Sequence, residues 1–133
     1  MVEVARGLIG TPYKFQGRKP GVGCDCIGLV ILTAWELGLF ESDFKNYSRN
    51  PGSILEREVK KYCLPLAELT PGALVLFKIN NVPQHCGIIT RYRNDWGLIH
   101  AYENVGKVRE HRLISWWKDK LVGIYKLPNV NYF

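Results

Sequence analysis

The sequence predicts an α+β fold, in which helices precede an antiparallel sheet. Helical patterns of apolar residues lie before residue 65, whereas the segments after residue 72 are short, rich in β-branched and aromatic residues, and separated by turn residues. A chain of 133 residues is long enough for one domain with its own core, and no linker or repeat divides it. We therefore expect a single domain over residues 1–133.

The first half contains three helical patterns. Residues 2–9 are weakly amphipathic, and residues 26 to about 37 are apolar on all sides, which predicts a buried helix that Gly38 ends. Ser53-Ile54-Leu55-Glu56 has the form of a capping box and predicts a helix from residue 54 to about 63.

The second half has the pattern of short strands. We expect an antiparallel sheet of five to six strands, because five segments have strand-like composition, with a helical turn at 115–118. These segments are 73–79, 86–92, 96–102, 108–113 and 121–127.

Charge and hydropathy narrow the possible partners and locations. The net charge is +6, but the densest charged run, residues 56–61, mixes acids and bases as a solvated helix face does. The overall charge suits an anionic partner, such as a polyanionic cell wall or a phosphate-bearing polymer, but does not choose between them. We expect no nucleic acid as partner. No apolar run approaches the roughly 20 residues of a membrane span, and residues 1–4 lack the basic start of a signal peptide. Synthesis in the cytoplasm, with free thiols, is therefore expected.

Cys26 is the candidate nucleophile. It follows a polar turn and occupies the first turn of the predicted buried helix, for which Asp25 is the expected N-cap. The unpaired N–H groups and partial positive charge of a helix N-terminus lower the pKa of a thiol, and the thiolate is the reactive form. Cys63 and Cys86 are better explained as small buried side chains.

The three histidines supply candidates for a base. His85 opens the second predicted strand and His100 closes the third, whereas His111 lies in a polar segment and is expected to be exposed. A cysteine, a separate histidine and a third polar residue that orients the histidine ring can carry out acyl transfer through a thioester.

The turn between the two strands decides whether His85 and His100 meet. A turn centred between Tyr92 and Arg93 places them directly opposite each other, whereas a tight turn at Asn94-Asp95 offsets them by four positions. The catalytic interpretation therefore requires the wider turn or a bulge.

A zinc site is the alternative use of the same side chains, which include Cys24, Cys26, His85, Cys86 and His100. However, Cys-x-Cys is tighter than the usual ligand spacing, and neighbouring residues of a strand point to opposite faces. We therefore expect no metal and no cofactor.

Five motifs in order resemble those of the NlpC/P60 family. They are Gly10-Thr11-Pro12-Tyr13, Gly23-Cys24-Asp25-Cys26-Ile27-Gly28-Leu29-Val30, Thr70-Pro71-Gly72-Ala73-Leu74-Val75-Leu76-Phe77, His85-Cys86-Gly87-Ile88 and Ile99-His100-Ala101. The chain most resembles the small cell-wall peptidases of phage and gene-transfer-agent tail modules. Those proteins similarly have an apolar residue after the cysteine and a tryptophan late in the helix, as Ile27 and Trp35 are here.

The resemblance implies a papain-like fold, with a buried nucleophile helix packed on the sheet. It implies that Cys26 is the nucleophile, His85 the base and His100 the residue that orients His85. Tyr13 and Asp25 match positions that shape the substrate side of the site. Ile27 replaces the usual serine, which removes a polar group that could bind the end of the substrate.

The activity that the resemblance implies is that of a cysteine endopeptidase acting on peptidoglycan stem peptides, at the bond between γ-D-glutamate and a diamino acid. Phage tail proteins are the further partners that it implies, with transport on a virion or release by lysis as the route to the cell wall. Two alternatives remain at this stage. One is an amidase or acyltransferase with the same Cys–His pair, and the other is an inactive component of a phage tail.

Overall fold

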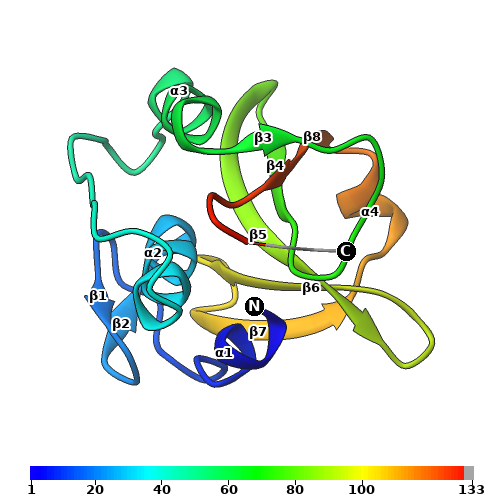
Figure 1. Cartoon of the computed structure of the whole chain (residues 1–133), viewed down its shortest axis with the longest axis horizontal. Coiled ribbons are helices and arrows are strands. Elements are labelled where there is room, and N and C mark those ends of the chain that lie inside the picture. Colours follow the sequence, from blue (N-terminus) through cyan, green and yellow to red (C-terminus); the bar gives the residue numbers. More distant parts are fainter. Residues whose placement is uncertain (131–133) are drawn as a thin grey trace.

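The structure, a computed structural model that describes residues 1–130, is built on a six-stranded antiparallel sheet (Figure 1). The helices are α1 (Val2–Arg6), α2 (Cys26–Glu36), α3 (Ser53–Tyr62) and α4 (Ser115–Lys118). The sheet has the order β3 (Leu64–Pro65), β8 (Leu121–Lys126), β4 (Leu74–Ile79), β5 (Val82–Tyr92), β6 (Asp95–Tyr102) and β7 (Lys107–Arg112). The short strands β1 (Arg18–Lys19) and β2 (Gly23–Cys24) pair separately. The α+β prediction is confirmed.

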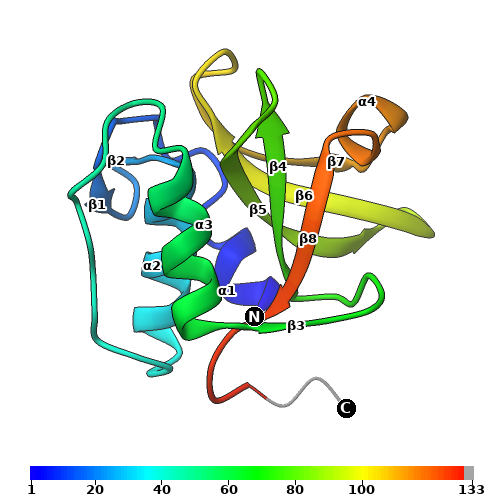
Figure 2. The ribbon, with the colours of Figure 1, turned by 90° about the horizontal axis from the view of Figure 1, so that it is seen from above.

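The main sheet separates two apolar clusters. Helices α1, α2 and α3 cover one face, and α4 lies on the other side (Figure 2). Leu29 of α2 and Leu55 of α3 pack with Ile88 on the first face, whereas Phe77 and Trp117 pack with Leu98 on the second. Among the described residues, no helix is long and apolar enough to cross a membrane.

Helix α2 has the predicted position and environment. Asp25 is its N-cap, and the Asp25 carboxylate accepts a hydrogen bond of 2.7 Å from the Gly28 amide. Every residue from Cys26 to Ala34 is buried, because the all-round apolar sequence lies between the sheet, α1 and the 39–52 loop. Gly38 follows the helix with φ of +68°, the left-handed conformation that favours glycine at this position.

Two predicted helix boundaries are wrong. Helix α1 ends at Arg6 rather than near residue 9. The predicted capping box at the start of α3 is absent, because Ser53 is already helical and the N-cap is Gly52, with φ of +56° and no side-chain hydrogen bond. A glycine in the left-handed region redirects the chain into α3 where the pattern predicted a serine cap.

The β5–β6 hairpin has neither of the turns considered from the sequence. Tyr92 pairs with Asp95, so the turn consists of Arg93 and Asn94, whose φ angles are +50° and +65°. Positive φ at both central residues is typical of a type I′ turn, whose twist matches that of the flanking strands. This register offsets His85 and His100 by two positions, between the two values expected.

Candidate active site

The Cys26 thiol lies at the N-terminus of α2, at the edge of a cavity of about 240 Å³. A hydrogen bond from the Cys86 side chain is the largest cause that lowers the pKa of Cys26, and a hydrogen bond and positive charge from His85 add to it. Burial opposes these effects, and the resulting pKa is about 5. Cys26 is therefore a thiolate at neutral pH, which is the reactive form.

His85 reaches this cavity from the sheet. It lies on the α4 face, in contact with Phe77 and Trp117, and it borders the same cavity as Cys26. Just before it, the register between β4 and β5 shifts, which leaves Gln84 without a partner in β4. A bulge of this kind bends a strand and redirects the side chains beside it.

His85 and His100 form a buried pair. The His85 Nε2 and His100 Nδ1 atoms are 2.8 Å apart, and Tyr102 and Trp117 pack against both rings. Burial, together with the positive charges of His85, His111 and Arg109, lowers the pKa of His100 to about 2. His100 is therefore neutral at neutral pH. Its ring can donate and accept hydrogen bonds, but it carries no charge.

Gly87 explains how the two rings meet across an offset of two positions. Diagonal neighbours on one face of a sheet are about 7–8 Å apart, within reach of long side chains if nothing lies between them. A Cβ atom on Gly87 would lie 3.1 Å from the His100 Cβ and 2.6 Å from Leu98 Cδ1. The glycine leaves the path between His85 and His100 open, so the wider turn that the sequence suggested is not needed.

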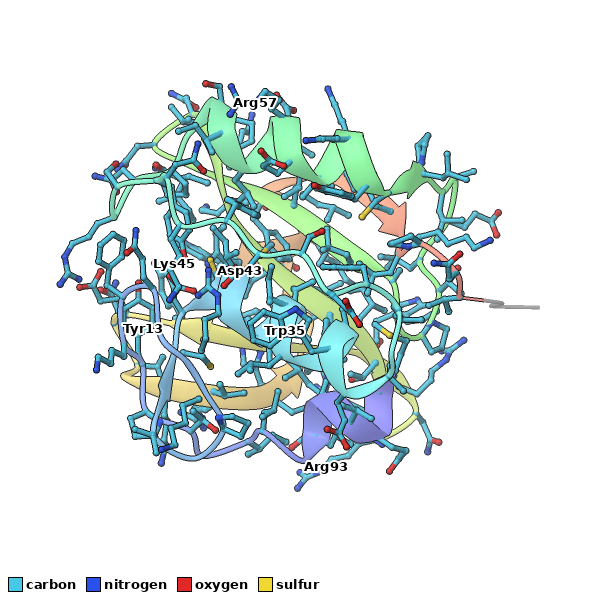
Figure 3. The ribbon with its side chains drawn as sticks, turned by 60° about the vertical axis from the view of Figure 1, so that its left-hand side comes forward. Tyr13, Trp35, Asp43, Lys45, Arg57 and Arg93 are labelled. Atoms are coloured by element: carbon cyan, nitrogen blue, oxygen red, sulfur yellow. The ribbon has the colours of Figure 1, made fainter. Side chains whose placement is uncertain are left out.

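Asp25 is the centre of a buried polar network beneath the nucleophile. Its carboxylate accepts hydrogen bonds from the Gly28 and Gln16 amides at 2.7 and 2.8 Å, from Tyr47 Oη at 2.7 Å and from Arg18 Nη1 at 3.1 Å. Arg18 also pairs with Asp43 at 3.0 Å, which Figure 3 shows close to the start of α2. Four donors, one of them a buried guanidinium, therefore hold the Asp25 carboxylate.

The remaining predicted site residues border the cavity in different ways. Tyr13 is half-buried, and burial together with the negative charges of Cys26 and Asp25 raises the pKa of its hydroxyl, which stays protonated as a donor. Ile27 is buried and borders this cavity from the other side of the nucleophile. The structure thus brings together all six residues, Cys26, His85, His100, Tyr13, Asp25 and Ile27, in and around one cleft.

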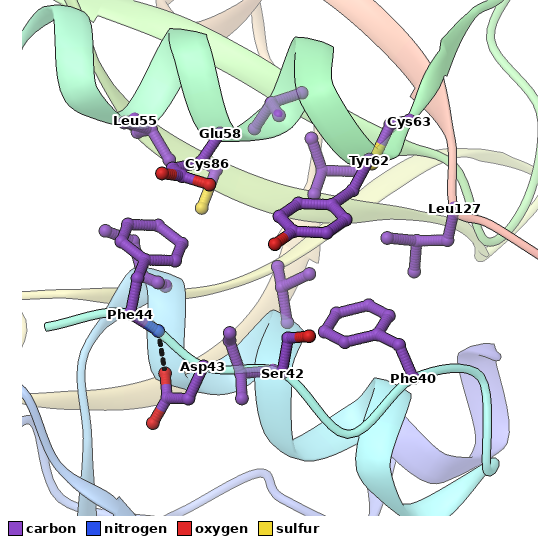
Figure 4. Close-up of a pocket in the computed structure, with 15 residues that line it drawn as sticks. Phe40, Ser42, Asp43, Phe44, Leu55, Glu58, Tyr62, Cys63, Cys86 and Leu127 are labelled. Carbon is purple, nitrogen blue, oxygen red and sulfur yellow. Dashed lines mark hydrogen bonds between the residues drawn. The ribbon is translucent and has the colours of Figure 1, made fainter.

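A second, smaller cavity lies between α2 and α3 (Figure 4). Its volume is about 50 Å³, and its walls are almost entirely apolar. Ile27 and Cys86 line it on the side of the nucleophile, and Phe40, Leu55 and Tyr62 close it from the loop and α3. Ile27 therefore separates the polar cleft from an apolar space.

Sequence reasoning missed three residues of the site. Cys86 does turn away from the His85 face, but toward Cys26, whose carbonyl oxygen lies 3.3 Å from the Cys86 sulfur. His111 is not an isolated exposed residue, since its Nε2 lies 2.7 Å from His100 Nε2. The same-face position of His111 on the next strand was a usable signal. For Arg18, in a long loop, nothing in the sequence pointed to Asp25.

The other thiols differ from Cys26 in their chemistry. Burial raises the pKa of Cys24 to about 12 and that of Cys63 to about 11, and a hydrogen bond with Cys26 raises the pKa of Cys86 well above its ordinary value. All four cysteines are free. Within residues 1–130, no group of three or more His, Cys, Asp or Glu side chains could hold a metal ion.

The fold and the cleft together define a class: an α+β protein with a thiolate at a helix N-terminus, beside a histidine pair on an antiparallel sheet. The model of the NlpC/P60 family matches residues 10–126. The chain belongs to the NlpC/P60 family.

Solved structures with the same fold are similar to nearly the whole chain. The NlpC/p60 domain of the peptidoglycan hydrolase SagA has 21% sequence identity and a TM-score of 0.63, with 95% of each chain covered. A lipoprotein-like NLP/P60 protein from Staphylococcus aureus has 19% identity and a TM-score of 0.67, and the match covers 96% of this chain but 40% of that one. The peptidoglycan hydrolase RipB from Mycobacterium tuberculosis has 20% identity and a TM-score of 0.64, over 97% and 63% of the two chains.

The chain thus spans less than two thirds of the length of two of these three proteins. A search of curated proteins finds no match to this chain.

Proposed function

We propose that this protein is a cysteine peptidase that hydrolyses amide bonds in the stem peptides of peptidoglycan. The observation that carries the proposal is the position of the Cys26 thiol in the first turn of α2, in the same cavity as His85. Hydrogen bonds with Cys86 and His85 there lower the pKa of the thiol to about 5. A buried thiol without such partners has a raised pKa, as Cys24 and Cys63 do. Membership of the NlpC/P60 family, and the structural similarity to the peptidoglycan hydrolases SagA and RipB, support the choice of substrate.

The proposed reaction has two steps. The Cys26 thiolate attacks the amide carbonyl carbon, and the backbone N–H of Cys26, in the first turn of α2, stabilises the negative charge that develops on oxygen. The C–N bond then breaks, and His85 gives a proton to the leaving amine, which leaves a thioester on Cys26. In the second step His85 takes a proton from a water molecule, the resulting hydroxide attacks the thioester, and the acid product leaves as the thiolate re-forms.

The cleft has groups suited to a polar peptide. Tyr13 offers a protonated hydroxyl beside Cys26. Arg49 and Glu103 lie at the rim of the cleft, where they form an ion pair of 3.0 Å and are both more than half exposed. Stem peptides contain carboxylates and amines that such groups can bind. We propose the bond between γ-D-glutamate and a diamino acid as the one that is cut, as the family resemblance implies.

The decisive experiment is digestion of purified muropeptides of defined stem composition, with products identified by mass spectrometry. We expect the wild-type protein to release fragments cut after γ-D-glutamate, and both Cys26→Ala and His85→Ala to release none, because removal of a general acid–base group typically costs about 10²–10⁴ in rate. Cys63→Ala is the matched control, since Cys63 is a buried thiol outside the cleft. Equal products from the wild-type and Cys26→Ala proteins would refute the proposal.

The same assay separates the alternatives. Release of intact stem peptides from the glycan, or transfer of the acyl group to an added amine, would identify an amidase or an acyltransferase on the same Cys–His pair. An inactive tail component would release no product from any stem type, and its Cys26 would have an ordinary thiol pH profile.

The proposed setting is a phage or gene-transfer-agent tail module, with synthesis in the cytoplasm. Its support is the resemblance noted for Ile27 and Trp35. In the structure Trp35 is partly buried, and its indole N–H donates a hydrogen bond of 3.1 Å to the Ser42 carbonyl. Immunodetection of the chain in purified particles from the source strain tests this proposal. Its absence from particles, with the protein present in the cell lysate, would contradict it.

A further inference from the structure

Three histidines, one from each of three neighbouring strands, form a continuous line of hydrogen bonds. His85 of β5 contacts His100 of β6 at 2.8 Å, and His100 contacts His111 of β7 at 2.7 Å. The line ends at the backbone, because His111 Nδ1 lies 2.7 Å from the Arg112 carbonyl oxygen. His85 borders the cleft beside the proposed nucleophile, and His100 orients His85. His111 is outside the cleft and has no role in the reaction described so far.

The carbonyl oxygen at the end of the line determines which nitrogen of each neutral ring holds a proton. A carbonyl oxygen can only accept, so His111 Nδ1 carries a proton and His111 Nε2 is an acceptor. His100 must then donate from Nε2, which leaves His100 Nδ1 as an acceptor. His85 in turn donates from Nε2. The other nitrogen of His85 is Nδ1, which is therefore the one that holds the proton given up by Cys26 when the thiolate forms.

The surroundings hold this line in place. His100 and His85 are buried, and the Trp117 ring lies 4.8 Å and 5.2 Å from the two ring centres. Strand β7 is fixed from the opposite face of the sheet, where Glu110 accepts from Arg6 at 2.9 Å and from Thr90 at 2.7 Å. Because His85 and His100 are buried, neither ring could replace a lost partner with solvent, whereas His111 is half-buried and its hydrogen bond with the Arg112 carbonyl is exposed.

We propose that His111 is a positioning residue, which selects the His100 tautomer and through it the His85 tautomer that can accept the Cys26 proton. The proposal rests on the proposed roles of Cys26 and His85. The site then consists of a row of four groups, Cys26, His85, His100 and His111. A hydrogen bond with the backbone carbonyl of Arg112 fixes the orientation of the last one, His111. His111 does not touch substrate, so it acts only through His100.

The first test reads the tautomers directly by NMR of ¹⁵N-labelled histidine rings, at about pH 8, above the ordinary imidazole pKa of about 6.5. The Cys26→Ala variant is used so that no thiolate pairs with His85. The chain has three histidines, so single substitutions assign the signals. We expect two rings protonated at Nε2, His85 and His100, and one at Nδ1, His111. Any other distribution overturns the proposal, whether or not a His111 variant folds.

The second test asks whether His111 controls the reactivity of Cys26. His111→Leu removes the acceptor, whereas His111→Gln keeps an acceptor oxygen for His100. We expect His111→Leu to slow alkylation of Cys26 by iodoacetamide roughly two- to tenfold, the value of one hydrogen bond, and His111→Gln to restore most of the rate. Equal rates in the wild-type and Leu proteins, with equal thermal unfolding, would overturn the proposal. Neither readout needs a substrate. A protein that fails to cut muropeptides but shows the expected tautomers would refute the hydrolase proposal alone.

Discussion

The two halves of the cleft are held by different kinds of interaction. On the helix side, a buried ion pair between Arg18 and Asp25 fixes the start of α2 and with it Cys26. On the sheet side, His100 holds His85 through a hydrogen bond, and the lowered pKa of His100, a consequence mainly of burial, keeps the His100 ring neutral. The first arrangement fixes the position of Cys26, and the second fixes which nitrogen of each histidine ring carries a proton.

This difference predicts different kinds of sensitivity. A buried ion pair has paid for the desolvation of both partners, so removal of one leaves an uncompensated charge. The neutral ring of His100 has no such charge to expose, but each ring in the row depends on the donor or acceptor state of the next. Damage to the helix side should therefore appear as lost stability, and damage to the sheet side as altered titration.

The largest effect is expected for Asp25→Ala. The Arg18 guanidinium, 7% exposed in the folded protein, would keep only Asp43 as an ionic partner, and the Gly28, Gln16 and Tyr47 donors would lose their acceptor. We therefore expect the free energy of unfolding to fall by about 3–5 kcal/mol. Urea denaturation followed by tryptophan fluorescence measures it. Glu103→Ala, which breaks the exposed pair with Arg49, is the matched control and should cost no more than about 1 kcal/mol.

A second variant separates the charge from the packing. Arg18→Met in the Asp25→Ala background removes the buried guanidinium that has lost Asp25 and keeps only the partly exposed Asp43, and it should recover part of the lost stability. If the double variant is less stable than Asp25→Ala alone, the ion pair is not what holds this side of the cleft.

A middle-sized effect is expected in the pH dependence of stability. The unfolded chain binds a proton at His100 near pH 6.5, whereas in the folded protein the pKa of His100 is about 2. The contribution of neutral His100 is therefore complete above pH 6.5, and is lost as the pH falls from 6.5 toward 2, by about 1.4 kcal/mol per pH unit. The free energy of unfolding at pH 7 and at pH 5 measures this loss.

His100→Gln is the comparison for that measurement, because glutamine can donate and accept in the same place but does not titrate. The decrease in stability between pH 7 and pH 5 should be smaller in this variant than in the wild-type protein. Identical decreases would mean that His100 is not the group that titrates.

The smallest effect is expected for Cys86→Ala. The Cys86 side chain is the largest cause of the lowered pKa of Cys26, and a hydrogen bond to a charged group contributes about 1.5–3 kcal/mol, which corresponds to roughly one to two pKa units. The pH profile of Cys26 alkylation should move upward by that amount. Cys86→Ser keeps a donor and should move it less, and Cys63→Ala should leave it unchanged. A profile that Cys86→Ala does not move would assign the lowered pKa to His85 and the helix alone.

Much of the helix side could be predicted from the sequence because it is local. Asp25, Cys26 and Gly38 lie within or next to one helix, and the spacing of a cap, a first turn and a stop is set by helix geometry. The predicted start of α3 was wrong for a local reason too, since Ser53 of the capping-box pattern and Gly52 compete for the N-cap position. The polar partners of Asp25, Arg18 and Tyr47, are long-range contacts that no periodicity encodes.

The sheet side could be predicted only in outline. Alternation along the strands placed His85 and His100 on one face, but the distance between them depends on the register, and the turn that sets it could not be chosen from composition. Arg93-Asn94 lacks the glycine that marks most type I′ turns. The contact with His111 has the same origin, since it follows from the register of the next strand pair.

The Arg93–Asn94 turn therefore has a consequence for how the protein can be altered. It lies at the far end of the hairpin, seven residues along β5 from His85, or roughly 23 Å at about 3.3 Å per residue. A one-residue insertion there that shifted the pairing would rotate His100 to the face covered by α2, and a two-residue insertion would slide it along β6 without rotation. The length of this surface loop, which touches nothing in the cleft, should thus affect the rate of the proposed reaction. Insertion of a tag or label at this tip is the modification to avoid.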